Sequence, residues 1–126
     1  MVKIVLNKDQ QEAINTIDGP LLITAGPGTG KTATLVGRYA NLVNNCGIKP
    51  ENIMMATFTE KAAKEIVTRI SSVVPNFDLN DVYIGTFHSI CLRIVRDNIA
   101  FIPNVKKNFI LMDDFDQKYF IFSKDL

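Results

Sequence analysis

A chain of 126 residues can form one domain with a real core, and it is short for a complete motor enzyme. Its 14 basic and 13 acidic side chains give a net charge of +1, so overall charge gives no argument for nucleic-acid binding. Two cysteines are too few for a disulfide framework or a metal site, and the apolar run Leu21–Ala25 is far too short to span a membrane. These features predict a soluble, cytoplasmic protein that does not bind a membrane.

Strand and helix patterns alternate along the chain. Apolar residues at 13, 14 and 17 predict a short helix over Gln10–Ile17, and the run Leu21–Ala25 predicts a strand buried on both faces. Further helices are predicted at about 31–45, 60–73 and 88–99 and from 114 onward, and further strands at 53–57, 82–86 and 109–112.

The alternation of elements also predicts the fold class. Strands that alternate with helices of ten or more residues pair in parallel through right-handed crossovers. We therefore expect an α/β fold, with a parallel sheet covered by helices on both faces. The core-facing residues of two of these helices are expected to be Leu35, Tyr39, Leu42 and Val43 in one, and Ile90, Cys91, Ile94 and Val95 in the other.

A glycine-rich loop lies between the first predicted strand and the helix that follows. It has the G-x-x-x-x-G-K-[ST] pattern of phosphate-binding loops, with Ala25 in place of the first glycine. Glycines let backbone N–H groups turn toward phosphate oxygens, and the following helix adds its free N-terminal donors. Lys31 would contact the β- and γ-phosphates, and Thr32 would supply a hydroxyl to Mg²⁺. The predicted ATP-binding residues of this loop are Ala25, Gly26, Pro27, Gly28, Thr29, Gly30, Lys31 and Thr32.

An ordinary glycine turn and a dinucleotide-binding loop are the alternative interpretations of this segment. The glycines at 26, 28 and 30 do not have the G-x-G-x-x-G spacing of dinucleotide sites. The Lys-Thr pair at the predicted helix start is typical of a triphosphate site, and strand, loop and helix follow in the order that such a site requires. The pattern therefore favours ATP.

Three segments flank this loop: Leu6–Ala13 before it, and Thr57–Glu65 and Thr86–Ser89 after the next two predicted strands. Together with the loop, in this order and spacing, they resemble the N-terminal part of superfamily 1 DNA helicases of the UvrD/PcrA/Rep type. The resemblance covers nearly the whole chain. It implies a RecA-like phosphate-loop domain in an ATP-dependent enzyme that acts on single-stranded DNA.

The resemblance also implies roles for single residues. Gln10 would bind adenine through its amide, which can donate and accept hydrogen bonds. The residues that would line the path of single-stranded DNA are Thr57, Phe58, Thr59, Thr86, Phe87 and His88. Hydroxyls can bond phosphate oxygens and aromatic rings can stack on bases without regard to sequence. Taken singly, the two phenylalanines could be core residues, and Gln10 and His88 could be solvated helix residues.

Three positions beside these motifs bear on the comparison with the best-known family members. Ala33 stands where those members carry an arginine that packs on the base, so adenine recognition would depend more on Gln10. Glu60 stands where they often carry asparagine, which leaves a DNA contact at that position open. Arg38 matches the family pattern.

Hydrolysis of ATP needs a second acidic motif that holds Mg²⁺ and positions water. Asp113 and Asp114 follow an apolar run and could be that motif in a small free-standing NTPase or kinase, which is the alternative reading. In the resembling helicases this stretch matches a segment after the Thr-Phe-His motif, and the true Asp-Glu-x-Gln motif comes later. A non-catalytic module that binds nucleotide or a protein is a third possibility.

The resemblance implies that residues 1–126 are the N-terminal part of the ATP-binding domain, with about 108–126 leading into an inserted subdomain. The missing partner would be the C-terminal motor domain, because helicases of this class close ATP between two domains. We expect the chain alone to bind ATP without efficient hydrolysis. Helicase activity would belong to the full-length enzyme.

Overall fold

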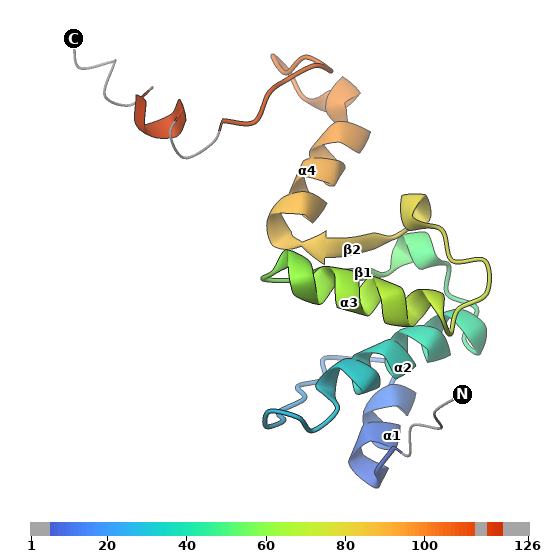
Figure 1. The fold of residues 1–126 in the computed structure, drawn as a ribbon. Coiled ribbons are helices and arrows are strands. Elements are labelled where there is room, and N and C mark those ends of the chain that lie inside the picture. The colour runs from blue at the N-terminus through green and yellow to red at the C-terminus, as the bar shows by residue number, and fades with distance from the viewer. Residues whose placement is uncertain (1–5, 113–115, 120–126) are drawn as a thin grey trace. The chain divides into compact units, whose positions relative to one another are not determined.

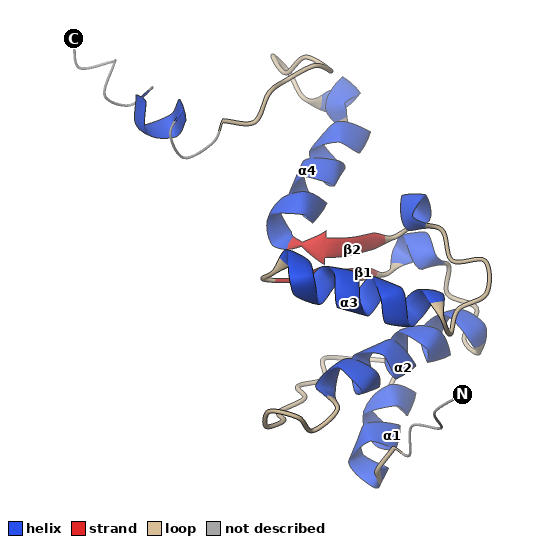
Figure 2. Cartoon of the chain, viewed as in Figure 1, coloured by secondary structure: helices blue, strands red, loops and turns tan. Residues whose placement is uncertain are grey.

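A computed structural model describes residues 6–112 and 116–119 of the chain. By its contacts the chain forms two compact units, residues 1–90 and 91–126. The elements in chain order are α1 (Lys8–Asn15), α2 (Lys31–Asn44), η1 (Pro50–Asn52), β1 (Met54–Thr57), α3 (Glu60–Ser71), η2 (Leu79–Asp81), β2 (Tyr83–Thr86), α4 (Phe87–Asp97) and η3 (Ile99–Phe101) (Figures 1 and 2). Helix α4 begins in the first unit and continues into the second.

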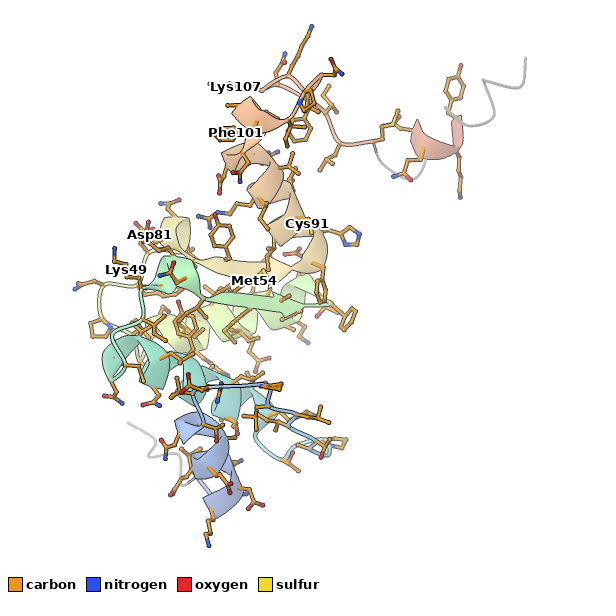
Figure 3. The ribbon with its side chains drawn as sticks, turned by 180° about the vertical axis from the view of Figure 1, so that it is seen from behind. Lys49, Met54, Asp81, Cys91, Phe101 and Lys107 are labelled. Carbon is orange, nitrogen blue, oxygen red and sulfur yellow. The ribbon has the colours of Figure 1, made fainter. Side chains whose placement is uncertain are left out.

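The first unit contains a two-stranded parallel sheet, which confirms the predicted parallel pairing of these two strands. Strands β1 and β2 run in register from Met54 opposite Tyr83 to Thr57 opposite Thr86. Helix α3 connects the strands and lies on one face of the sheet (Figure 1). On the other face Met54, labelled in Figure 3, remains 63% exposed. The predicted covering of the sheet by helices is therefore confirmed on the face that α3 occupies and not on the other face.

The core of this unit lies between the sheet, α3 and α2. Its fully buried side chains are Tyr39 of α2 and Ile70 of α3, which are 1% and 0% exposed. Met55 and Ile84 pack against this cluster from the strands. Helix α2 contacts α3, and α1 contacts α2, so the elements follow one another as sheet, α3, α2 and α1 (Figure 1).

Polar side chains define where two of these helices begin. Asn7 caps α1 by accepting a hydrogen bond from the backbone N–H of Gln10, and the Gln10 side chain accepts one from the Asn7 N–H. This reciprocal pair is a capping box. Thr59 caps α3 by accepting from the Ala62 N–H at 3.2 Å. The boundaries predicted for α2, α3 and α4 agree with the structure to within two residues.

Two predicted strands are wrong. Residues 21–25 have no ladder partner among the described residues, and Leu22 is 86% exposed. Residues 109–112 likewise form no strand, and Ile110 is 89% exposed. An apolar run becomes a strand only when a neighbouring backbone accepts its hydrogen bonds, and no described segment lies beside either run in that way.

The predicted helix faces also need correction. In α2 the buried residues are Thr34, Val36 and Tyr39, whereas Leu35 is 40% exposed. In α4 only Ile90 is buried, and Cys91 and Ile94 of the predicted stripe are exposed. Helical spacing is correct in both cases, but a periodic pattern does not determine which part of an apolar arc finds a partner.

The second unit comprises the end of α4, the short helix η3 and irregular chain as far as residue 112. Arg93 and Asp97 form an ion pair at 3.6 Å on the last turns of α4. Residues 116–119 form a helical turn within the predicted last helix, whereas Asp113 and Asp114 lie outside the described residues. In the described ranges no helix has the length and apolar character to cross a membrane.

Candidate nucleotide and DNA site

The glycine-rich loop leads directly into α2. Gly28 and Gly30 have φ angles of 74° and 83°, a backbone region that glycine adopts without strain. Gly30 is the residue before the helix, and no side chain in the described part of the protein caps α2 there. The first N–H groups of a helix have no partner within it, so this helix start presents donors and a positive dipole end.

Lys31 and Thr29 fix the shape of the loop from within. The Lys31 ammonium donates to the carbonyl oxygens of Ala25 and Gly26, at 3.0 and 3.3 Å. The Thr29 hydroxyl donates to the Gly26 carbonyl at 2.7 Å. The ammonium is thus held over the start of the loop, and it remains exposed. A group with stronger acceptor oxygens could replace these carbonyls as its partner.

Gln10 joins α1 to the glycine-rich loop. Its Nε2 atom donates to the Thr29 carbonyl at 2.9 Å, while its Oε1 atom accepts from the Asn7 N–H at 2.9 Å. One N–H and one lone pair of the amide are left for a further partner. The link to Asn7 was missed in the sequence, although Asn-x-x-Gln before an apolar stripe is a recognisable capping-box pattern.

A cavity of about 330 Å³ lies between α1 and the loop. Its lining is mixed, and its size lies at the lower end of the range of small-molecule sites. The residues that line it are Asn7, Asp9, Gln10, Ala13, Ile23, Thr24, Ala25, Gly26, Thr29, Lys31 and Thr34. The structure therefore brings the sequence-predicted residues Gln10 and Lys31 to one cavity. Among the described residues no group of three or more His, Cys, Asp or Glu side chains could hold a metal ion, so the Mg²⁺ role of Thr32 stays a prediction.

The predicted DNA-binding residues lie together at the carboxyl ends of β1 and β2. Thr57 and Thr86 are register partners, so the residues that follow them are neighbours as well. The rings of Phe58 and Phe87 lie with centroids 5.4 Å apart at an interplanar angle of 55°. Phe58 is 92% exposed and Phe87 is 50% exposed, so neither ring is a core residue. His88 is exposed in the first turn of α4.

The threonine hydroxyls at this site already have partners within the protein. Thr57 donates to the Thr59 carbonyl at 3.0 Å, and the Thr59 hydroxyl accepts the capping bond of α3. The Thr86 hydroxyl lies 3.2 Å from Glu60 Oε1 and 3.1 Å from Ser89 Oγ. The rings of Phe58 and Phe87 instead keep large exposed surfaces, which suits stacking better than phosphate binding.

The order of these segments can be compared with known proteins. The family model of the UvrD/REP helicase N-terminal domain matches residues 6–124. The chain belongs to this family.

Individual members of the family are similar over most of the chain. ATP-dependent DNA helicase PcrA of Bacillus subtilis is 47% identical over 113 residues, which are 89% of this chain and 15% of the relative. The PcrA helicase of Staphylococcus epidermidis is 42% identical over 113 residues, 90% of this chain and 15% of that protein. A probable DNA helicase II homolog of Rickettsia felis is 50% identical over 94 residues, 75% of this chain and 14% of the relative. The chain thus spans about one-seventh of the length of these relatives.

Proposed function

We propose that residues 1–126 are the N-terminal part of the ATP-binding domain of an ATP-dependent DNA helicase that moves on single-stranded DNA. Family membership supports the helicase assignment, and residues from about 108 onward would lead into an inserted subdomain. The observation that carries the proposal is the joint position of Gln10 and Lys31 on one cavity beside the start of α2.

In the proposed complex the loop 25–32 is a phosphate-binding loop. Phosphate oxygens replace the carbonyls of Ala25 and Gly26 as acceptors for the Lys31 ammonium, because a charged acceptor forms the stronger hydrogen bond. The free N–H groups at the start of α2 hold the same phosphates. Thr32 would offer its hydroxyl to Mg²⁺, which would offset the negative charge of the phosphates. The remaining N–H and lone pair of Gln10 bind adenine.

Single-stranded DNA occupies the surface at the ends of β1 and β2. Phe58 and Phe87 stack on bases there, with His88 and the threonines Thr57, Thr59 and Thr86 along the same path. Stacking does not depend on charge, so it would let a chain of net charge +1 bind single-stranded DNA.

We also propose that the 126-residue chain binds ATP without efficient hydrolysis. Closure of ATP between two motor domains, one of them the C-terminal motor domain of the longer protein, would complete the site. The relatives named ATP-dependent DNA helicase are several times longer than this chain.

Titration of the chain with ATP and Mg²⁺ tests the nucleotide site. Lys31→Ala should weaken ATP binding at least tenfold, about 1.4 kcal/mol, because it removes the cation that holds the phosphates. Lys64→Ala, at an exposed position on α3, is the control and should leave the affinity unchanged. Equal affinities of the wild-type chain and Lys31→Ala would refute the loop assignment.

A steady-state ATPase assay tests the second proposal. We expect no turnover above background, with or without single-stranded DNA. An activity that disappears in Lys31→Ala would show that the chain hydrolyses ATP by itself. It would also favour the free-standing NTPase or kinase with Asp113 and Asp114 as metal ligands.

A further inference from the structure

Arg38, in the middle of α2, binds the end of α1. Its Nη1 atom donates to the Ala13 carbonyl at 2.6 Å and also to the Thr16 carbonyl, and its Nη2 atom reaches the Ile17 carbonyl at 3.5 Å. The last carbonyls of a helix have no partner within it and form the negative end of its dipole. The half-buried guanidinium, with several donors in a fixed plane, satisfies the carbonyl of Ala13 in the last turn and those of Thr16 and Ile17 directly after the helix.

Two neighbouring positions on α2 strengthen the same attachment. Asn41, one turn beyond Arg38, donates through Nδ2 to the Ile14 carbonyl at 3.1 Å. At Gly37 a Cβ atom would lie only 2.7 Å from Ile14 Cδ1, so the helices approach as closely as a glycine permits. Gly37, Arg38 and Asn41 together form what we call the α1 clamp.

The α1 clamp holds a helix whose other end carries Gln10. The Gln10 amide donates to the Thr29 carbonyl, and a Cβ atom at Gly30 would lie 2.9 Å from Gln10 Nε2. The amide therefore has little room beside the glycine-rich loop. A small shift of α1 relative to α2 would move it out of hydrogen-bond range, because hydrogen bonds weaken steeply with distance and angle.

The phosphate-binding groups do not depend on α1 in this way. Lys31 and the free N–H groups at the start of α2 belong to α2 itself, and the contacts of Lys31 are within the loop. Loss of the clamp should thus affect the base end of the site and leave the phosphate end in place.

We propose that Arg38 is a positioning residue for base recognition. It holds α1 in place, and this keeps the Gln10 amide where it can form hydrogen bonds with adenine. The inference rests on the proposed ATP site. It predicts that Arg38 contributes to the affinity for ATP but not to the affinity for inorganic tripolyphosphate, which has the phosphates without the base.

The test compares the two ligands on the 126-residue chain with Mg²⁺ present. Arg38→Ala should weaken ATP binding about tenfold and change tripolyphosphate binding less than twofold. Arg38→Lys, which keeps the charge but loses the planar set of donors, should fall between Arg38→Ala and the wild type. Arg69→Ala is the control, since Arg69 has an exposed partner, Glu65, one turn away on its own helix.

A double-mutant cycle with Gln10→Ala separates positioning from general loosening. If Arg38 acts through Gln10, Arg38→Ala should weaken ATP binding much less in the Gln10→Ala background than in the wild type. Thermal unfolding of each variant shows which ones are folded, and Arg38→Lys carries the comparison if Arg38→Ala does not fold. Equal losses for ATP and tripolyphosphate, or additive effects of the two substitutions, would overturn the inference.

The same experiment distinguishes a failure of the proposed function from a failure of this inference. If the wild-type chain binds neither ligand, or if Lys31→Ala binds tripolyphosphate as well as the wild type, the phosphate site is wrong and the inference falls with it. If the wild type binds both ligands through Lys31 and Arg38→Ala binds ATP as tightly, only the role of Arg38 is refuted.

Discussion

The Thr86 hydroxyl lies 3.2 Å from a carboxylate oxygen of Glu60, which joins the end of β2 to the first turn of α3. Glu60 thereby places a negative charge one residue after the capping residue Thr59 and two after Phe58, at the surface proposed for DNA. At the start of a helix a carboxylate is stabilising, but near a phosphate chain it is repulsive.

Glu60→Gln should therefore strengthen the binding of single-stranded DNA by about two- to fivefold at low salt, because the repulsion is removed. The amide oxygen can still accept the Thr86 bond. Fluorescence anisotropy with a labelled oligonucleotide measures the effect, and Glu65→Gln, five residues further along α3, is the matched control. Weaker binding in Glu60→Gln would instead show that the carboxylate supports the site.

The exposed aromatic pair leads to a second prediction. Phe58→Ala should weaken the binding of single-stranded DNA by about 1–3 kcal/mol, the free energy that stacking of one base on an aromatic ring usually contributes. The melting temperature should change little, because the ring is 92% exposed. Phe101→Ala removes a ring that is 84% exposed elsewhere in the chain and should leave DNA affinity unchanged. Equal effects of Phe58→Ala and Phe101→Ala would place the DNA path away from the strand ends.

Tyr39 provides a prediction about stability. Its hydroxyl is buried and has no hydrogen-bond partner in the described part of the chain. Tyr39→Phe should therefore leave the free energy of unfolding unchanged or raise it by about 1 kcal/mol, because no bond is lost and a desolvated polar group disappears. Urea unfolding at neutral pH measures this, with Tyr119→Phe at an exposed position as the control. A loss of stability in Tyr39→Phe would contradict it.

The same hydroxyl makes stability depend on alkaline pH. Burial raises the pKa of Tyr39 above its usual value of 10.0. The folded state therefore keeps this proton to higher pH than the unfolded state, so the free energy of unfolding falls as the pH rises beyond 10.0. Unfolding free energies measured at neutral and alkaline pH should fall less in Tyr39→Phe than in the wild type. Identical slopes would show that the phenol is not desolvated.

A substitution at Ile70 tests whether the core between α3 and α2 stabilises the fold. Its side chain is fully buried in the cluster with Val36 and Tyr39. Ile70→Ala should lower the free energy of unfolding by about 2–5 kcal/mol, through lost burial and the cavity that remains. Lys64→Ala on the exposed face of the same helix should change it by less than about 0.5 kcal/mol. Similar values for the two variants would mean that the α2–α3 contact does not stabilise the fold.

The sequence by itself predicted helices α2, α3 and α4 and the paired strands β1 and β2. The apolar stripe of α3 and the position of α2 after the glycines follow from helical periodicity and from glycine geometry, which are properties of neighbouring residues. The order of the motifs also pointed to the family that the comparison then showed. These features need no knowledge of which segments touch.

Only the tertiary structure decided the rest, because the deciding contacts join residues far apart in the chain. The register of β1 and β2 brings Phe58 beside Phe87. Arg38 binds the carbonyl of Ala13 near the end of α1, which lies 25 positions earlier in the chain. Leu21–Ala25 has the composition of a buried strand, but its neighbours decide whether it becomes one, and no segment within residues 6–112 and 116–119 pairs with it. Hydrogen bonding between strands and packing between helices are pairwise properties, so a pattern within one segment cannot specify them.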